Sequence, residues 1–427
     1  VRSSHQAVAY TFRFRPWPRP VRRSPRGRVR PLDRTSLPMP ERRTFLKALG
    51  AGALGAAATG FSTPPARAPS ASTNPSDPSP PDSAPTNWVW MTPELDVSGE
   101  EWRRRFERLR AHNIDAILPQ VYTNSAAYYG SDFLPVEGEW LETILPPAKE
   151  VGLEVHGWMV SMPCTIPKIV NQHKEWFVVN RNGESAVDNP AYVDYYKFTC
   201  PNRPGAQDFI ERRVEEITSI DGLDGIHFDY IRFPDVVIAE ALQPKYGIVQ
   251  HEEQAPYDYC YCDVCRSKFE RDHGADPYDL EDPTTSTAWR LFRYESITNL
   301  VNDRLIPIAR ENGKAVSAAT FPNWEAVRQR WHHWDLDYVH PMLYHNFYHA
   351  GANWVRDETR AGIERLRGQG RSTRLYSGLN VGAVAPGGLE RLIEKAHEGD
   401  ASGITLFAAG SMNDALWTAF AEATSKA

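Results

Sequence analysis

The alternation of short apolar runs with amphipathic segments constrains the fold of this chain more than any other feature. Eight apolar runs of strand length follow position 87, and several stretches between them have the period of an α-helix. Strands that alternate with helices form a parallel sheet, and eight such units in about 340 residues predict a (β/α)8 barrel. The runs are Trp88–Thr92, Ala116–Tyr122, Glu154–Ser161, Gly225–Phe233, Ala315–Phe321, Tyr338–Tyr344, Arg374–Val381 and Gly403–Ala409.

An open, doubly wound sheet is the alternative fold for the same alternation. It would place a glycine-rich, phosphate-binding turn after the first strand, and this chain has Met91-Thr92-Pro93-Glu94 there. We therefore expect the barrel, with any active site at the carboxyl ends of its strands.

The connections after the third and fourth strands are much longer than the usual length of about two to six residues. They span 162–203 and 234 to about 287, and they contain all five cysteines of the chain. Since loops after neighbouring strands rise side by side on one face of a barrel, cysteines that are far apart in the sequence can meet there.

Three of these cysteines, Cys260, Cys262 and Cys265, form a C-x-C-x2-C pattern that suits three ligands of one tetrahedral zinc ion. Cys200 is the predicted fourth ligand, and the alternatives are Cys164 and His273. A four-thiolate site has no open position for water, so we expect a structural zinc ion. Disulfide bonds are the competing interpretation, since an exported protein can form them.

The fourth run contains the most distinctive segment of the chain, Leu223-Asp224-Gly225-Ile226-His227-Phe228-Asp229-Tyr230-Ile231-Arg232-Phe233-Pro234. Side chains alternate across a strand, so its apolar residues should face the helices while His227 and Asp229 face the barrel axis. Asp229 then lies at the mouth, where burying a carboxylate is costly unless the group is hydrogen-bonded or functional. Asp229 is the predicted catalytic residue, and a salt bridge between Asp229 and Arg232 is the structural alternative.

The same alternation predicts which other side chains line the mouth. Aromatic rings that stack on C–H faces, mixed with neutral hydrogen-bonding groups, are typical of a sugar site. The predicted partner is therefore a polysaccharide or oligosaccharide, and no organic cofactor is expected. The predicted substrate-binding residues are Gln120, Tyr122, Trp158, His227, Arg232, His340, Tyr344 and Asn380.

A family resemblance rests on the fourth-strand segment 224–234, the upstream Cys200-Pro201-Asn202-Arg203-Pro204 and the downstream Pro341-Met342-Leu343-Tyr344. These segments resemble glycosyl-hydrolase-like barrels labelled family-10-like, and the resemblance covers most of residues 87–420. It implies a (β/α)8 glycosidase domain that acts on polysaccharide outside the cytoplasm, some relatives acting on the glycan strands of peptidoglycan. The segment Cys260–Cys265 is also similar to the zinc-binding cluster that follows the fourth strand in certain barrel β-galactosidases.

The fourth strand resembles that of chitinases only in part. The start Asp224-Gly225-Ile226 and the later Asp229 match, but Ile231 stands where chitinases have their acid glutamate. The chitinase mechanism therefore does not transfer directly.

Glycoside hydrolysis usually needs a second carboxyl group. Asp235 and Glu325 are the leading candidates, because Asp235 is closest to Asp229 in the sequence and Glu325 lies on the next loop. A substrate with a 2-acetamido group can supply its own carbonyl as the nucleophile, in which case one protein carboxyl suffices. The other acids just beyond strand ends are Glu94, Asp96 and Asp132.

The N-terminal sequence reads as a leader. Residues 1–38 are rich in Arg and Pro, do not begin with Met, and are interpreted as an upstream extension. Residues 39–68 resemble a twin-arginine signal peptide, with Arg42-Arg43 before a short apolar stretch. Residues 69–86 form a Pro- and Ser-rich linker, and residues 87–427 form the folded domain. We therefore expect export to the periplasm or the extracellular space.

The charge balance argues against some classes of binding partner. Residues 1–86 carry 14 basic and 4 acidic side chains, which leaves 34 basic and 50 acidic ones in residues 87–427, a net charge of −16. Such a surface repels phosphate backbones and anionic lipids, so nucleic acid and stable membrane insertion are not expected. The sequence as a whole predicts an exported glycoside hydrolase, with a non-catalytic carbohydrate-binding barrel as the alternative.

Overall fold

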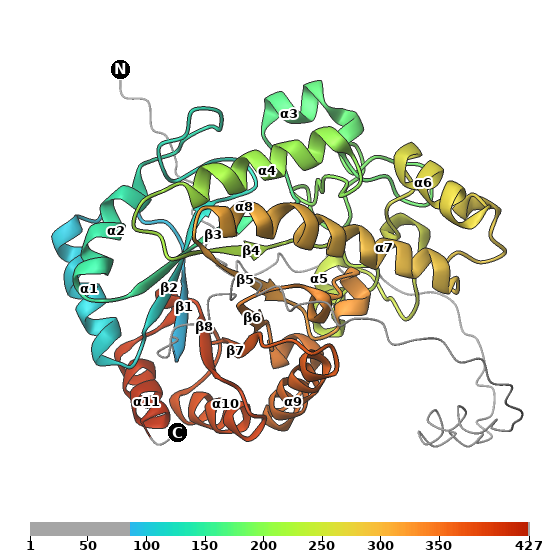
Figure 1. Ribbon diagram of the computed structural model, residues 1–427. Helices are drawn as coiled ribbons and strands as arrows, with labels where there is room; N and C mark the ends of the chain where they lie inside the picture. The colour runs from blue at the N-terminus through green and yellow to red at the C-terminus, as the bar shows by residue number, and fades with distance from the viewer. Residues whose placement is uncertain (1–85, 426–427) are drawn as a thin grey trace, which may run out of the picture. The chain divides into compact units, whose positions relative to one another are not determined.

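The computed structural model describes residues 86–425, in which eight parallel strands close into a barrel in sequential order. The predicted (β/α)8 fold is therefore confirmed, and Figure 1 shows the strands at the centre with helices around them. The predicted leader and linker, residues 1–38, 39–68 and most of 69–86, lie outside the described residues. The strands are β1 (Asn87–Met91), β2 (Ala116–Tyr122), β3 (Glu154–Val160), β4 (Gly225–Asp229), β5 (Ala315–Thr320), β6 (Tyr338–Pro341), β7 (Arg374–Asn380) and β8 (Gly403–Phe407).

The helices follow the amphipathic segments of the sequence. A π-helical turn, Leu300–Leu305, joins α7 to α8, so these two form one nearly continuous helical segment. Within residues 86–425, no helix has both the length and the apolar character needed to cross a membrane. The helices are α1 (Gly99–Ala111), α2 (Trp140–Glu150), α3 (Pro167–Gln172), α4 (Pro204–Thr218), α5 (Gln243–Tyr246), α6 (Asp263–His273), α7 (Thr287–Asn299), α8 (Ile306–Glu311), α9 (Ala352–Gly368), α10 (Pro386–Glu398) and α11 (Asp414–Thr424).

Strand β4 ends at Asp229, four residues earlier than the apolar run in the sequence. Tyr230 has a φ of 51°, in the left-handed region that non-glycine residues seldom adopt, so the extended conformation stops there. Its backbone N–H donates to Oδ1 of Asp229 at 2.7 Å. The turn therefore makes Asp229 the last residue of the strand, at the carboxyl end of the barrel.

The predicted alternation of side chains is confirmed on β4. Ile226 and Phe228 belong to the large core between the strands and the helices. The barrel interior holds a second, smaller apolar cluster built on aromatic rings. Its fully or nearly buried members are Trp88, Trp90, Ala116, Leu118, Trp158, Ala319, Tyr338 and Tyr376.

Two long segments stand on the carboxyl side of β3 and β4, residues 161–203 and 230–286. Backbone hydrogen bonds join them, among them the bond from Tyr261 N to Val179 O at 2.8 Å. An antiparallel bridge also pairs Asn180 with Tyr259. The two loops that contain all five cysteines are thus held side by side.

Candidate functional site

Asp229 is a nearly buried carboxyl at the mouth of the barrel, with 7% of its surface exposed. The indole Nε1 of Trp158, on the adjacent strand β3, donates to its Oδ2 at 3.1 Å. Burial raises the pKa of Asp229 to about 6, while the hydrogen bonds from Tyr230 and Trp158 and the charge of Arg232 oppose that rise. A carboxyl with this pKa can be protonated or ionised near neutral pH, as acid–base catalysis requires.

Aromatic side chains surround Asp229. Tyr344 is almost fully buried, and burial together with the charge of Asp229 raises the pKa of its phenol well above the usual value. Phe407, the last residue of β8, lies 5.6 Å from the Tyr344 ring and 6.4 Å from the Trp158 ring, centroid to centroid. The structure thus brings Asp229, Trp158 and Tyr344 together, as the sequence predicts.

A layer of neutral histidines lies below the mouth. Nε2 of His227 accepts a hydrogen bond from Trp90 Nε1 at 3.0 Å, so the proton of this imidazole is on Nδ1, which is 2.9 Å from Ser317 Oγ. His340 stacks on Tyr376, and its Nδ1 lies 2.8 Å from Thr405 Oγ1. Burial lowers the pKa of His227 and of His340 well below the usual value. These histidines are buried supports of the site, and direct sugar contact by either stays a prediction.

The remaining predicted lining residues fall into two groups. Gln120 and Asn380 are partly exposed at the ends of β2 and β7, and Oδ1 of Asn380 accepts from the backbone N–H of Gly382 at 3.0 Å. Tyr122 instead belongs to the outer core, with the guanidinium of Arg213 4.9 Å from its ring centroid. The register of β2 against β3 shifts between Gln120 and Tyr122, which turns Tyr122 away from the axis.

Arg232 and Asp235 form a buried ion pair, with 3.0 Å between Arg232 Nη1 and Asp235 Oδ2. Tyr196, from the loop after β3, contacts both groups through its hydroxyl, at 3.4 Å from Asp235 Oδ2 and 3.3 Å from Arg232 Nη2. The salt bridge considered for Arg232 therefore forms with Asp235 and not with Asp229. It also occupies one oxygen of the first candidate for a second catalytic carboxyl.

Glu325 lies in the short helix Trp324–Val327 after β5, and its side chain is exposed. It lines a surface hollow together with Glu253, Arg290 and Tyr294. In the described part of the chain, no hydrogen bond or ion pair joins Glu325 or Asp235 to Asp229. The other acids considered, Glu94, Asp96 and Asp132, are exposed.

Phe407 and Trp90 belong to the site although they were not predicted. Both face the barrel interior, and their rings lie 5.9 Å apart, centroid to centroid. The alternation that identifies Asp229 on β4 would also have identified them on β8 and β1.

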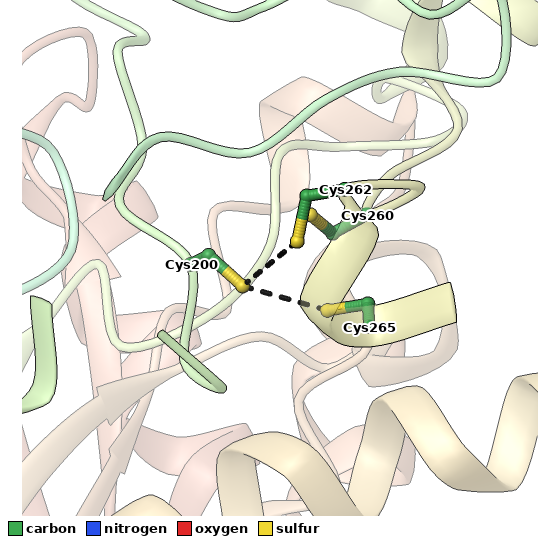
Figure 2. A group of neighbouring side chains, drawn as sticks. All are labelled: Cys200, Cys260, Cys262 and Cys265. Carbon is green, nitrogen blue, oxygen red and sulfur yellow. Dashed lines mark hydrogen bonds between the residues drawn. The ribbon is translucent and has the colours of Figure 1, made fainter. Parts of the chain in front are cut away.

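The second site is a cluster of four buried cysteines, Cys200, Cys260, Cys262 and Cys265, whose sulfur atoms all lie within 4.8 Å of one another. Cys200 comes from the loop after β3, and the other three come from the start of α6 and the segment before it (Figure 2). The Cys200 sulfur is 3.4 Å from that of Cys265 and 3.7 Å from that of Cys262. The predicted ligand set is thus brought together, and it can hold a metal ion.

The alternatives to this set are not in the cluster. All five cysteines are free thiols in the structure, with Cys164 buried apart from the other four. His273 is exposed at the end of α6 and is not part of the cluster. Hydrogen bonds from Cys200, Cys260 and Cys265 lower the pKa of Cys262, whereas burial raises the pKa of Cys260 well above its usual value, so without an ion the negative charge is favoured on Cys262 alone of these two.

The comparison with protein families gives one match. The model of the family described as glycosyl hydrolase-like 10 matches residues 87–388. A search of curated proteins finds no significant match.

Among solved structures, the catalytic domain of a β-amylase from Paenibacillus polymyxa is similar, with a TM-score of 0.55 and 11% identity over 80% of this chain and 98% of that one. A β-galactosidase from Halorubrum lacusprofundi has a TM-score of 0.56 and 12% identity, over 80% of this chain and 58% of that one. A β-galactosidase from Marinomonas ef1 has a TM-score of 0.55 and 12% identity, over 80% and 59%. This chain therefore spans less than two thirds of the galactosidases, and at these identities the likeness is one of fold.

Proposed function

Because the chain belongs to the glycosyl hydrolase-like 10 family, we propose that it hydrolyses O-glycosidic bonds of a polysaccharide. The observation that carries this proposal is Asp229, a buried carboxyl with a raised pKa at the mouth of the barrel, within a wall of aromatic rings. The similar structures are named as a β-amylase and β-galactosidases, which supports a carbohydrate substrate.

In the proposed mechanism, Asp229 is the general acid. Its raised pKa of about 6 keeps it protonated in mildly acidic solution, so that it can give its proton to the leaving glycosidic oxygen. Trp158 fixes the orientation of the carboxyl through its hydrogen bond. The rings of Tyr344 and Phe407 offer faces on which a sugar can stack.

The attacking group is proposed to come from the substrate. Asp235 would have to leave its buried pair with Arg232 to serve as a nucleophile, and Glu325 is exposed on a surface hollow. A sugar with a 2-acetamido group needs no second protein carboxyl, because its own carbonyl oxygen attacks the anomeric carbon. Glycans of the bacterial cell wall carry such groups, which makes them the first substrates to test.

The experiment is a measurement of reducing ends released from a panel of glycans with and without 2-acetamido groups. The wild-type protein should release reducing ends from at least one acetamido glycan, and Asp229→Asn should reduce the rate by about a hundredfold or more. Asp132→Asn, which changes an exposed acid beyond another strand, is the matched control and should keep the wild-type rate.

The second candidate function is a non-catalytic carbohydrate-binding barrel. It is favoured by the same observation that only Asp229, among the acids considered, is placed at the aromatic mouth. Binding of oligosaccharide without release of reducing ends from any glycan in the panel would support this function and contradict hydrolysis.

We propose further that the four-cysteine cluster holds a structural zinc ion through Cys200, Cys260, Cys262 and Cys265. Four thiolates in tetrahedral reach of one ion are a preferred zinc environment and leave no position for a catalytic water. Export by a twin-arginine signal, also proposed, fits such a centre, because it carries proteins that have already folded and bound their metal.

A further inference from the structure

The surroundings of the cysteine cluster contain donors aimed at sulfur. The backbone N–H of Val179 donates to Cys260 Sγ at 3.5 Å, and the side-chain amide of Asn202 donates to Cys265 Sγ at 3.4 Å. A neutral thiol is a weak acceptor, whereas groups around metal centres are commonly placed to support the ligands. These donors therefore fit sulfur atoms that carry negative charge.

Four thiolates around a divalent ion leave two net negative charges in a buried place, which requires nearby positive charge. One such cation is Lys268, which acts through Asn202. Lys268 Nζ donates to Asn202 Oδ1 at 3.0 Å, and the side-chain amide of Asn202 donates to Cys265 Sγ. The other is Arg203, whose backbone N–H donates to the carbonyl of Cys200 at 3.2 Å and whose side chain lines the same pocket as Cys262.

Arg203 has an unused donor at this place. Its terminal nitrogens pair with Asp263, while its Nε is buried without a hydrogen-bond partner. A buried N–H without a partner is rare and costly, so this donor is available to an acceptor that comes within its reach.

Arg203 and Cys262 also line one surface pocket of about 690 Å³. Cys262 is the most exposed of the four cysteines, at 3%. Arg266 lines this pocket too, but its Nε, unlike that of Arg203, is used in a hydrogen bond, to Asp276 Oδ1 at 3.1 Å.

We infer that Arg203 is the outer partner of the metal centre: it balances the thiolate charge and covers the side of the centre that faces this pocket, through which the ion enters and leaves. The inference rests on the proposed metal centre and is independent of glycoside hydrolysis. The equivalent outer residues of other metal sites contribute roughly ten- to a hundredfold to metal affinity.

The test compares metal release from the full chain, reduced and reconstituted with Zn²⁺, to an excess of a chromogenic chelator. Arg203→Met should release the ion about tenfold faster or more, because both the charge and the cover are lost. Arg266→Met is the matched control from the same pocket and should release it at the wild-type rate. Arg203→Lys keeps the charge but not the planar donors, so its rate should lie between those of the wild type and Arg203→Met.

Equal release rates for Arg203→Met and Arg266→Met, with about one ion bound by the wild type, would overturn the role of Arg203 and leave the metal centre standing. A reduced wild-type protein that binds no Zn²⁺ would overturn the centre and this inference together. If Arg203→Met does not fold, the comparison of Arg203→Lys with Arg266→Met decides, since unchanged release from Arg203→Lys contradicts a cover made by the guanidinium.

Discussion

Trp158 donates its indole hydrogen to Asp229 across the neighbouring strands β3 and β4, with 3.1 Å between Nε1 and Oδ2. This bond stabilises the ionised carboxylate and so opposes the effect of burial, which raises the pKa of Asp229. Trp158 on β3 thus helps to set the pKa of the Asp229 carboxyl on β4.

Replacement of Trp158 by Phe should therefore raise the pKa of Asp229 further above 6. If Asp229 is the general acid, the fall of kcat/KM with rising pH should move to higher pH in Trp158→Phe. The comparison is with Trp90→Phe, which removes the donor to His227 and should leave the midpoint in place. A midpoint that does not differ between the two variants would contradict the role of Trp158.

The pH dependence of the free energy of unfolding should also show the raised pKa of Asp229. Its pKa is raised from 3.8 to about 6, so the folded state holds the proton more tightly than the unfolded chain does. The wild type therefore loses stability as the pH rises from 3.8 through about 6, by about 3 kcal/mol once both states are ionised. Asp229→Asn carries no such charge and should gain stability relative to the wild type between pH 4 and pH 8, measured by urea unfolding. A constant difference across this range would show that the pKa is not raised.

Asp235 should matter for folding. Its pair with Arg232 is almost fully buried, and the loss of one partner of a buried pair typically costs about 3–5 kcal/mol. Asp235→Asn should thus lower the midpoint of chemical unfolding markedly. Asp414→Asn, which removes the exposed partner of Arg108, should hardly change it. A stable Asp235→Asn protein that has lost turnover would instead identify Asp235 as a catalytic carboxyl.

Metal content should depend on Cys262 and not on Cys164. Cys262→Ser removes one of the four clustered sulfurs, so the protein should lose its ion and unfold at a lower temperature. Cys164→Ser changes a buried cysteine outside the cluster and should keep about one equivalent of zinc by elemental analysis. Disulfides among the four cysteines in mass spectra of the purified protein would contradict the zinc site.

Export should depend on the paired arginines of the leader, which lie outside the described residues. Arg42→Lys combined with Arg43→Lys should leave the precursor in the cytoplasm, because this pair is what the proposed translocase recognises. Cell fractionation and immunoblotting measure the distribution, with Arg103→Lys combined with Arg104→Lys, an arginine pair on the surface of α1, as the control. Full secretion of the first double mutant would exclude the twin-arginine route.

The barrel could be predicted from the sequence because each strand is short, buried and followed by an amphipathic segment. On β4 the period of two also placed Asp229 and His227 on the inner face and Phe228 on the outer one. The same rule failed for Tyr122, since the shift of register in β2 arises in the pairing with β3 and a strict period of two does not allow for it.

The polar contacts beyond the strand ends were less predictable. The left-handed turn at Tyr230 ends β4 early, and Arg232 then pairs with Asp235. The pairing of Arg232 with Asp235 also involves Tyr196, which comes from a different loop and hydrogen-bonds to both. The cysteine cluster could be predicted because three of its members are adjacent in sequence, whereas Arg203 and Lys268 carry no such pattern.

The cysteine cluster joins sulfurs 62 residues apart along the chain, at Cys200 and Cys262. An ion held there closes a loop of the chain that contains α4 and β4, much as a disulfide cross-link would. Closing a loop of this length removes conformational entropy from the unfolded chain, worth about 4 kcal/mol if the link is as permanent as a disulfide. An ion that stayed bound would thus restrict the unfolded chain as well as the native loops. Strand β4, which ends in Asp229, lies within this loop of the chain and is synthesised before the last three ligands of the ion.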